Sequence, residues 1–354
     1  MKAMIMAAGV GSRLMPLTVD IPKPMIPVAN RPLMESIVNL LYTHGYRELI
    51  ANLHYHKQVI SKYFGDGSAF GLDLIYSPEE VLLGTAGGVK NCEWFLDECF
   101  VVISGDALTD VNLTNLYLNH KKKGALATIA LKEVEEVEQF GVVVSDQKGR
   151  IQKFQEKPKR KEALSRLVNT GIYIFEPEIF KYIPAGQFYD FGKQLFPHLV
   201  EIGAPFYGIP IDEYWCDVGD IETYRRAHAD ILQGKVAVRG KGIMHNTEEG
   251  RLLLAENVHI EDGALLTGNT VIGSGCRIEA GACIKDSVVW GNTEVKAGAF
   301  LSKCIVGKNC KIGKSAIINP GAAIASGCKL EDNEKIKLGQ KVFIHLEEEQ
   351  LQQA

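Results

Sequence analysis

The last third of the chain repeats one aliphatic residue at every sixth position. A period of six is typical of a left-handed parallel β-helix, in which three hexapeptides complete one triangular coil. The repeat therefore predicts this fold for residues 251–330. It runs in two sets separated by a change of phase, Ile260, Leu266, Ile272, Ile278, Ile284 and Trp290, and then Val306, Ile312, Ile318, Ile324 and Leu330.

Two further patterns accompany this repeat. Small residues stand two positions before the aliphatic ones, at Cys276, Ala282, Cys304, Cys310, Ala316, Ala322 and Cys328. Glycines suited to the corners of the coils are Gly273, Gly281, Gly291, Gly307 and Gly313. Of the 12 Tyr, 14 Phe and 3 Trp, only Trp290, Phe300 and Phe343 lie beyond residue 244, as expected where a narrow interior has little room for rings.

Residues 1–233 alternate short apolar runs with amphipathic stretches. This rhythm predicts a Rossmann-like α/β domain with a mostly parallel sheet and helices on both faces. Sites in such sheets lie at the carboxyl ends of strands, which directs attention to the loops after Ala8 and Ser104. The expected strands are 2–8, 49–53, 72–76 and 100–104, and the expected helices are 33–44, 57–64, 88–96 and one that ends near 233.

The chain becomes strand-rich from Gly141 onward, with a hairpin expected at Asp146–Gly149. A polar stretch nearly free of aromatic residues, 234–250, is expected to be a linker between the two domains. Residues 331–354 are expected to cap the end of the β-helix. The prediction is therefore two domains, an α/β domain and a β-helix.

Composition excludes several classes of protein. The 39 basic and 43 acidic residues nearly cancel, which disfavours a nucleic-acid partner. No apolar run reaches membrane-spanning length, and because Gly9, Gly11 and Arg13 interrupt the first apolar stretch we expect no signal peptide. Its 8 cysteines form no C-x-x-C pair and are expected to be reduced, as in the cytoplasm. His54 and His56 lack further ligands at zinc-binding spacing, so we expect no zinc site there.

The loop after the first strand reads AAGVGSRLMPLTVDIPKPMIPV. Gly9 and Gly11 allow backbone N–H groups to face a phosphate, although a tight turn explains the two glycines equally well. The dinucleotide fingerprint fails because Leu14 stands at its third glycine, and no Walker lysine follows. Arg13, together with a lysine held between two prolines, Lys23, favours a polyphosphate ligand.

The chain resembles the sugar-1-phosphate nucleotidyltransferases, or nucleotide-sugar pyrophosphorylases, and most closely the mannose-1-phosphate guanylyltransferases. Hexapeptide domains are common in that family, so the resemblance covers nearly the whole chain. One small departure is Ser12, where threonine is more usual. The segments that carry the resemblance are GVGSRLMPLT, PKPMIPV, LGTAGGV, SGDALTD, FGVVV, FQEKP, NTGIYIF and WCDVG.

The resemblance implies a set of site residues. Arg13, Lys23 and Asp106 are the implied catalytic residues, and Asp106 and Asp217 are the implied Mg²⁺ ligands. The implied nucleotide-binding residues are Ala8, Gly9, Gly11, Ser12, Leu83, Gly84, Thr85, Gly87 and Gly88. The implied sugar-phosphate residues are Gly141, Glu156, Lys157, Asn169 and Thr170. Without the resemblance, these carboxylates and the E-K-P and N-T-G segments are equally compatible with simple turns and caps, and we expect Asp110 to cap the helix that begins near Leu113.

The activity that the resemblance implies is transfer of a nucleotidyl group from a nucleoside triphosphate to a sugar-1-phosphate, with release of pyrophosphate. A stretch 83–88 without glutamine favours GTP, and the resemblance favours mannose-1-phosphate, while uridylyl or thymidylyl transfer to another sugar remains the alternative. A non-catalytic homologue is disfavoured because the charged residues are retained. Acyltransfer by the β-helix is disfavoured because His259 is the only histidine within the repeat. We expect the β-helix to support a homo-oligomer.

Overall fold

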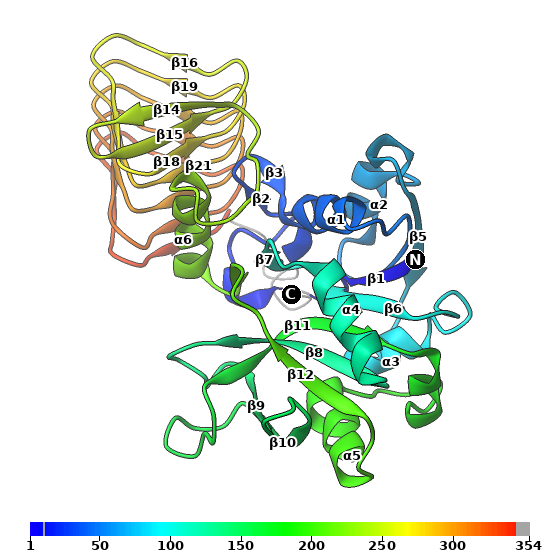
Figure 1. Cartoon of the computed structure of the whole chain (residues 1–354). Coiled ribbons are helices and arrows are strands. Elements are labelled where there is room, and N and C mark those ends of the chain that lie inside the picture. The colour runs from blue at the N-terminus through cyan, green and yellow to red at the C-terminus, as the bar shows by residue number, and fades with distance from the viewer. Residues whose placement is uncertain (10, 345–354) are drawn as a thin grey trace. The chain divides into compact units, whose positions relative to one another are not determined.

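The computed structural model describes residues 1–9 and 11–344 and divides into two compact units (Figure 1). The sheet unit comprises residues 1–9 and 37–215, and the coil unit comprises 10–36 and everything from 216 onward. The predicted α/β domain therefore contributes to both units, since 10–36 and 216–233 group with the coil unit. Among the described residues, none of the helices combines the length and the apolar character needed to cross a membrane.

A nine-stranded sheet forms the sheet unit, and its first half is parallel. The strand order β5-β4-β1-β6 places the first strand of the chain in the interior, where its middle residues are fully buried. These strands are β1 (Lys2–Met6), β4 (Glu48–Leu53), β5 (Asp73–Pro78) and β6 (Phe100–Ser104). The helices in this part are α1 (Leu33–Thr43), α2 (Lys57–Phe64), α3 (Gly84–Lys90) and α4 (Leu113–Lys123). This confirms the predicted α/β class.

The second half of the sheet is largely antiparallel and centres on β11 (Leu167–Phe175). This strand pairs antiparallel with β6, β8 and β9. The predicted hairpin is present, because β9 and β10 pair antiparallel on either side of residues 146–149. The remaining elements are β7 (Ala107–Thr109), β8 (Ala127–Glu133), β9 (Gly141–Ser145), β10 (Ile151–Glu156), η5 (Phe191–Leu195), α5 (Phe196–Glu201) and β12 (Phe206–Pro210).

Two local predictions for the sheet unit differ from the structure. The helix expected at 88–96 begins earlier, at Gly84, and ends at Lys90. Gly87 lies inside this helix, and glycine is needed there because a Cβ would come within 2.9 Å of the Gln187 carbonyl oxygen. The predicted cap of α4 was also wrong: the side chain of Asn112 accepts from the Asn115 N–H, whereas Asp110 accepts from the Tyr214 N–H.

In the coil unit, short strands stack into three sheets that form the walls of a β-helix (Figure 1), and all pair in parallel except the first two, Ile243–Thr247 and Gly250–Leu254, which are antiparallel. The first wall is β14 (Ile243–Thr247), β15 (Gly250–Leu254), β18 (Thr270–Ile272), β21 (Val288–Val289), β24 (Ile305–Val306), β27 (Ala323–Ile324) and β30 (Lys341–Val342). The second is β16 (His259–Ile260), β19 (Arg277–Ile278), β22 (Glu294–Val295), β25 (Lys311–Ile312) and β28 (Lys329–Leu330). The third is β17 (Leu265–Thr267), β20 (Cys283–Lys285), β23 (Phe300–Ser302), β26 (Ile317–Ile318) and β29 (Lys335–Ile336).

These walls extend beyond the predicted β-helix at both ends. β14 lies within the stretch expected to be a linker, and β29 and β30 follow residue 330, where the repeat was expected to end. The described part of the predicted cap, 331–344, thus continues the stack, whereas 345–354 lie outside the described residues.

The interior of the β-helix contains the predicted aliphatic and small residues with two exceptions, Ile260, which is 36% exposed, and Trp290. Trp290 is not among the interior residues, and Val289 takes its place, paired with Ile272 and Val306. The interior positions advance by five residues instead of six from Ile284 to Val289. The indole of Trp290 instead lies against α6 (Ile221–Leu232), where its Nε1 donates to the Tyr224 hydroxyl at 2.9 Å.

A second five-residue step runs from Leu301 to Val306, and the two short steps shorten the middle coils. Cys283 pairs with Leu265, 18 residues earlier, whereas Phe300 pairs with Cys283, only 17 residues earlier. The spacing returns to 18 between Ile305 and Ala323. A pattern of apolar residues at every sixth position accepts Trp290 as readily as an aliphatic residue. The sequence therefore predicted a single change of phase, after Trp290.

Close stacking of successive coils explains several of the glycines. A Cβ at Gly307 would come within 2.5 Å of the Ser326 backbone nitrogen, and one at Gly273 within 2.4 Å of the Gly291 nitrogen. Gly281 has a φ of +70° and fits the expected role of a corner residue. Most of the selected glycines are thus required by the neighbouring coil and not by their own backbone conformation.

Candidate active site

The phosphate-loop segment of the coil unit folds into two short 3₁₀ turns, Ser12–Leu14 and Lys23–Met25. Gly11 has a φ of +74°, and a Cβ there would come within 2.7 Å of the Lys23 Cβ. Glycine is therefore required at position 11 both by conformation and by close approach. The Thr18 hydroxyl donates to the Gly11 carbonyl oxygen at 3.0 Å and ties the loop together. This geometry brings Gly11 and Ser12 next to the segment that carries Lys23.

Three predicted charged residues converge within the coil unit. The Lys23 Nζ lies 3.0 Å from the Asp217 Oδ1, and the Arg13 Nη2 lies 3.7 Å from the Asp217 Oδ2. The lysine side chain is only 8% exposed, whereas that of Arg13 is 55% exposed. A buried ammonium requires a partner, and Asp217 supplies it. Arg13 remains accessible to a ligand in solvent.

The short segment after β13 (Trp215–Asp217) explains how Asp217 is held. The Gly219 N–H donates to the Asp217 carbonyl oxygen at 2.8 Å, which closes a tight turn, and Asp220 then caps α6 through a capping box with Thr223. A Cβ at Gly219 would lie 2.9 Å from the Arg13 Nη2 and 3.1 Å from the Asp217 Oδ2. Gly219 therefore leaves space for the Arg13 guanidinium, a role that the sequence analysis did not assign.

In the sheet unit, a buried polar pair links the end of β1 to the start of α3. The Asn52 Oδ1 accepts from the Ala7 N–H at 2.9 Å, and its Nδ2 donates to the Glu79 Oε1 at 2.8 Å. The Glu79 Oε2 accepts from the Leu83 N–H at 3.0 Å. Both side chains are buried, so this network fixes the predicted nucleotide residues Ala8 and Leu83 relative to each other. Sequence reasoning missed it, since no motif marks Asn52 or Glu79.

The predicted base-binding segment 83–88 packs against a distant stretch of the same unit. A Cβ at Gly84 would come within 2.7 Å of the Tyr189 carbonyl oxygen, which also accepts from the Gly87 N–H at 2.9 Å. The Thr85 hydroxyl donates to the Asp190 Oδ2 at 3.0 Å. A Cβ at Gly88 would instead meet the Glu79 Oε1 at 2.7 Å. These glycines were predicted to let a nucleotide base approach the backbone closely. In the structure they let other segments of the same unit approach it instead.

Gly9 and Asp106 lie where parallel strands end. Gly9 follows β1 and is exposed, and a Cβ at this position would meet no other atom within 4 Å. Asp106 follows β6, and the preceding Gly105 N–H donates to the Met6 carbonyl oxygen at 2.9 Å. Since Ser104 pairs with Met6, the carboxyl ends of β1 and β6 are adjacent, as the strand-end rule predicts.

Acidic residues surround Tyr173 in the sheet unit. Burial raises the pKa of Tyr173, the hydrogen bond from Asn169 opposes this, and the charges of Asp190, Glu156 and Asp106 raise the pKa further. The Asn169 Nδ2 donates to the Tyr173 hydroxyl at 3.0 Å. The structure therefore brings Asp106 into the same electrostatic neighbourhood as two of the predicted sugar-binding residues, Glu156 and Asn169.

Glu156 is the last residue of strand β10, and Lys157 follows it. Burial raises the pKa of Glu156, Lys157 lowers it, and Asp190 raises it again. The Lys157 Nζ lies 4.0 Å from the Glu156 Oε1, but its side chain is 62% exposed. Its φ is +46°, a strained value for a lysine, which turns the chain out of β10. Lys157 is thus placed where its ammonium can reach a ligand.

The other two predicted sugar residues have structural roles. The hydroxyl of Thr170 is buried and donates to the Ala130 carbonyl oxygen at 2.7 Å, and the Thr170 carbonyl accepts from the Trp215 Nε1. Gly141 lies under the ring of Phe154, which a Cβ would strike at 2.3 Å. These residues support the strands that carry Glu156 and Asn169.

One group of potential metal ligands was not predicted from the sequence. Within residues 1–9 and 11–344, Cys99, His120 and Glu176 are the only three such residues whose ligand atoms all lie within 4.8 Å of one another. The Lys121 Nζ lies 2.5 Å from the Glu176 Oε1, and burial raises the pKa of Cys99 to about 12. A neighbouring ammonium and a protonated thiol disfavour a cation here.

Comparison with known proteins agrees with this geometry. A family model for nucleotidyl transferases matches residues 2–234, and one for the GMPPB C-terminal domain matches residues 248–347. The UTP–glucose-1-phosphate uridylyltransferase of Synechocystis sp. is 41% identical over 342 residues, which cover 88% of each chain. The mannose-1-phosphate guanylyltransferase of Mycobacterium tuberculosis is 32% identical over 306 residues, or 85% of this chain and 83% of that one.

A solved nucleotidyltransferase structure from Bacillus anthracis is also similar. It superposes with a TM-score of 0.61 at 26% identity and covers 68% of this chain and 97% of its own. Together with the matching family models, the similarity extends over the α/β part and the β-helix. The chain therefore belongs to the nucleotidyl transferase family, as a sugar-1-phosphate nucleotidyltransferase with a C-terminal β-helix.

Proposed function

We propose that this protein transfers a guanylyl group from GTP to mannose-1-phosphate and releases pyrophosphate. The observation that carries the proposal is the buried ammonium of Lys23, held on Asp217 beside the exposed guanidinium of Arg13. A buried ammonium and an accessible guanidinium beside a glycine loop suit a triphosphate, because together they neutralise its charge.

In this mechanism an oxygen of the sugar phosphate attacks the α-phosphorus in line, and pyrophosphate leaves on the opposite side. The nucleophile is already an anion at neutral pH, so the reaction needs no general base. The barrier is the approach of two anions, which positioning and charge neutralisation reduce. We assign Lys23 to the α-phosphate and Arg13 to the departing β- and γ-phosphates. The exposure of Arg13 is consistent with a group that must release its product.

On the sugar side, we assign Glu156 and Asn169 to the hydroxyl groups and Lys157 to the phosphate. Asn169 is held in place because its Oδ1 accepts from the Gly171 N–H and its Nδ2 donates to Tyr173. An ionised carboxylate at Glu156 accepts hydrogen bonds from sugar hydroxyls. The exposed ammonium of Lys157 balances the negative phosphate. Thr170 and Gly141 contribute by supporting these strands.

The resemblance implies Mg²⁺, and the donor chemistry fits it. Asp106 and Asp217 offer carboxylate oxygens, the donors that Mg²⁺ prefers beside substrate phosphates. Both residues are partly exposed, each within its own unit. We propose them as the ligands, and bound Mg²⁺ would neutralise charge on the reacting phosphates. Asp217 would then also keep Lys23 in place through its Oδ1.

A second donor and acceptor pair is favoured by one observation. The relative that is 41% identical over 88% of this chain is a UTP–glucose-1-phosphate uridylyltransferase. UTP and glucose-1-phosphate are therefore the second candidate pair. Segment 83–88, which lacks glutamine, and the GMPPB C-terminal match support the guanylyl proposal instead.

A pyrophosphate-release screen distinguishes the candidates. Each of the four ribonucleoside triphosphates and dTTP is incubated with mannose-1-phosphate, glucose-1-phosphate or N-acetylglucosamine-1-phosphate in Mg²⁺ buffer. We expect the highest kcat/KM with GTP and mannose-1-phosphate. A preference for UTP and glucose-1-phosphate would replace that assignment. Absence of pyrophosphate release with every pair would reject nucleotidyl transfer. The Lys23→Ala variant serves as the inactive control.

We also propose that the β-helix mediates homo-oligomerisation. Leu265, Cys283, Phe300 and Ile317 pair in register across the third wall, where Leu265 is 55% and Phe300 42% exposed. An exposed apolar ladder of this kind suits association with a second copy. Light scattering should find an oligomer for the wild type and a monomer for Phe300→Glu. A monomeric wild type would contradict the proposal.

A further inference from the structure

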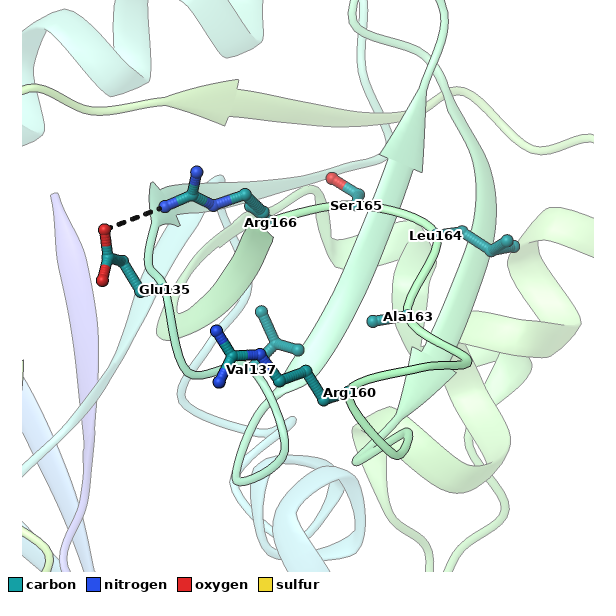
Figure 2. A pocket seen from close by; sticks show the side chains of 7 residues that line it. All are labelled: Glu135, Val137, Arg160, Ala163, Leu164, Ser165 and Arg166. Carbon is teal, nitrogen blue, oxygen red and sulfur yellow. Dashed lines mark ion pairs between the residues drawn. The ribbon is translucent and has the colours of Figure 1, made fainter.

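A pocket of about 470 Å³ opens in the sheet unit outside the residues assigned to the substrates (Figure 2). The loop after β8 forms one side of it, and the loop between β10 and β11 forms the other. Its volume lies in the range typical of small-molecule sites. The residues that line it are Glu135, Val137, Arg160, Ala163, Leu164, Ser165 and Arg166.

Two arginines and one glutamate line the pocket, so its lining carries a net charge of +1 in a protein whose net charge is −4. Figure 2 shows the guanidinium groups of Arg160 and Arg166 directed to the side on which Glu135 lies. Within residues 157–166 there are five basic residues, Lys157, Lys159, Arg160, Lys161 and Arg166, and one acidic residue, Glu162. The loop on the other side carries four acidic residues, Glu133, Glu135, Glu136 and Glu138, so the two guanidinium groups that line the pocket are what favour an anionic ligand.

The ion pairs of Arg166 are weak enough to exchange for a ligand. Its Nη2 lies 3.5 Å from the Glu135 Oε1, and its Nε lies 3.7 Å from the Glu133 Oε1. All three side chains are more than half exposed, so solvent screens these pairs and they contribute little to stability. A phosphate offers the same guanidinium a bidentate partner of higher charge.

The walls of the pocket are held in place before any ligand binds. The Gln155 side chain donates to the Glu162 carbonyl oxygen at 3.0 Å and accepts from the Leu164 N–H at 2.9 Å. The Val134 N–H donates to the Arg166 carbonyl oxygen at 3.0 Å and joins the two loops. Beneath them, Val137 and Ala163 belong to a small apolar cluster of their own. Binding would therefore order little additional chain.

We propose that this pocket binds a small phosphate ester at a site separate from that of the substrates. The guanidinium groups of Arg160 and Arg166 and the hydroxyl of Ser165 would bind the phosphate. The short carbon part would lie against the apolar floor. Lys157, assigned to the sugar phosphate, does not line the pocket. The proposal concerns binding alone and does not depend on which nucleotide the protein transfers.

Titration calorimetry with glycerol 3-phosphate tests this proposal. The wild type should show saturable binding with a Kd below about 1 mM. The double variant Arg160→Ala/Arg166→Ala should bind at least about tenfold more weakly. Lys161→Ala removes a charge from the same loop but not from the pocket lining, and it should stay within about twofold of the wild type. Circular dichroism of each variant verifies the fold, since the replaced side chains are exposed.

Three results would overturn the proposal. One is the lack of saturable binding by the wild type below about 10 mM. Another is an equal loss of affinity in Lys161→Ala, which would mean that the ester responds to the overall positive charge of the loop and not to the pocket. The third is binding that survives in the double variant and disappears in Lys157→Ala, because the ester would then occupy the proposed sugar-phosphate site. Glycerol and inorganic phosphate, each titrated alone, show how much each part of the probe contributes.

Discussion

The ammonium of Lys23 lies 3.0 Å from the carboxylate of Asp217, a residue 194 positions further along the chain. Only 8% of the lysine side chain is exposed, so this contact determines where its charge is presented. The prolines on either side of Lys23 and the glycine at position 11 restrict the backbone that carries it. The position of the Lys23 ammonium is thus set both by the contact with Asp217 and by the restricted backbone.

Lys23→Ala should reduce kcat by about 10²–10³, because it removes one preorganised cation from the proposed transition state. Thermal unfolding should still show a folded protein, since Arg13 continues to contact the Asp217 carboxylate. Steady-state kinetics with pyrophosphate detection measures the effect. Lys122→Ala, on the exposed end of α4, is a matched control with unchanged kinetics. A near-wild-type kcat in Lys23→Ala would remove this residue from the mechanism.

Gly219→Ala should displace the guanidinium of Arg13, since the new Cβ would lie 2.9 Å from the Arg13 Nη2. The displaced atoms are the far end of a flexible side chain, so stability should change little. We expect kcat/KM to fall about tenfold or more, because a small misplacement of a catalytic group is costly. In the Arg13→Ala background the same substitution should have almost no further effect. Fully additive losses would mean that Gly219 acts through something other than Arg13.

Trp290→Phe should destabilise the coil unit. The substitution removes the Nε1 donor to the Tyr224 hydroxyl and leaves a space beside a fully buried tyrosine. We expect the free energy of unfolding to fall by about 2–3 kcal/mol. Trp94→Phe, at a tryptophan that is 70% exposed, should change it by less than about 0.5 kcal/mol. Equal effects of the two substitutions in chemical denaturation would contradict a structural role for the Trp290–Tyr224 contact.

Acidification should destabilise the protein through His228. Burial lowers the pKa of this histidine from 6.5 to about 3, so the folded state resists protonation while the unfolded state accepts a proton below pH 6.5. Its contribution to stability is therefore complete above pH 6.5 and is lost as the pH falls toward 3. Between pH 7 and pH 5 the loss should be about 2 kcal/mol.

His228→Asn tests that expectation. Its side-chain oxygen can replace the ring Nδ1 that accepts from the Ala29 N–H, but it does not titrate in this range. The difference in unfolding free energy between pH 7 and pH 5 should shrink in this variant. His198→Asn, at a histidine whose side chain is 42% exposed, should retain the wild-type difference. Identical pH profiles for the wild type and His228→Asn would rule out His228 as the source.

The fold was largely predictable because its signals are local and periodic. Strand and helix periods identified the parallel strands, and the six-residue repeat identified the β-helix. The error at Trp290 arose because a count of apolar positions cannot distinguish a side chain inside the coil from one that packs against α6. The cap of α4 was misassigned because Asp110 and Asn112 are both good capping residues, and the Tyr214 N–H, which engages Asp110, lies 104 positions away.

The site was predictable only where motifs mark it. Arg13, Lys23 and Asp217 were selected from separate segments, and the structure brings these three together. Asn52 and Glu79 escaped notice because their importance lies in a pairing 27 positions apart, with no pattern around either one. Thr170 shows the opposite case, since it belongs to a recognisable motif but directs its hydroxyl to the Ala130 carbonyl.

The grouping of residues 10–36 with the part of the chain after 215 has a consequence for synthesis. The glycine loop leaves the ribosome well before the carboxylate that holds its lysine, which follows nearly two hundred residues later. During that interval the loop lacks its electrostatic anchor, and the final geometry is reached only when Asp217 and the start of α6 emerge. The lysine at the centre of positive charge is therefore made long before the residue that holds it in place.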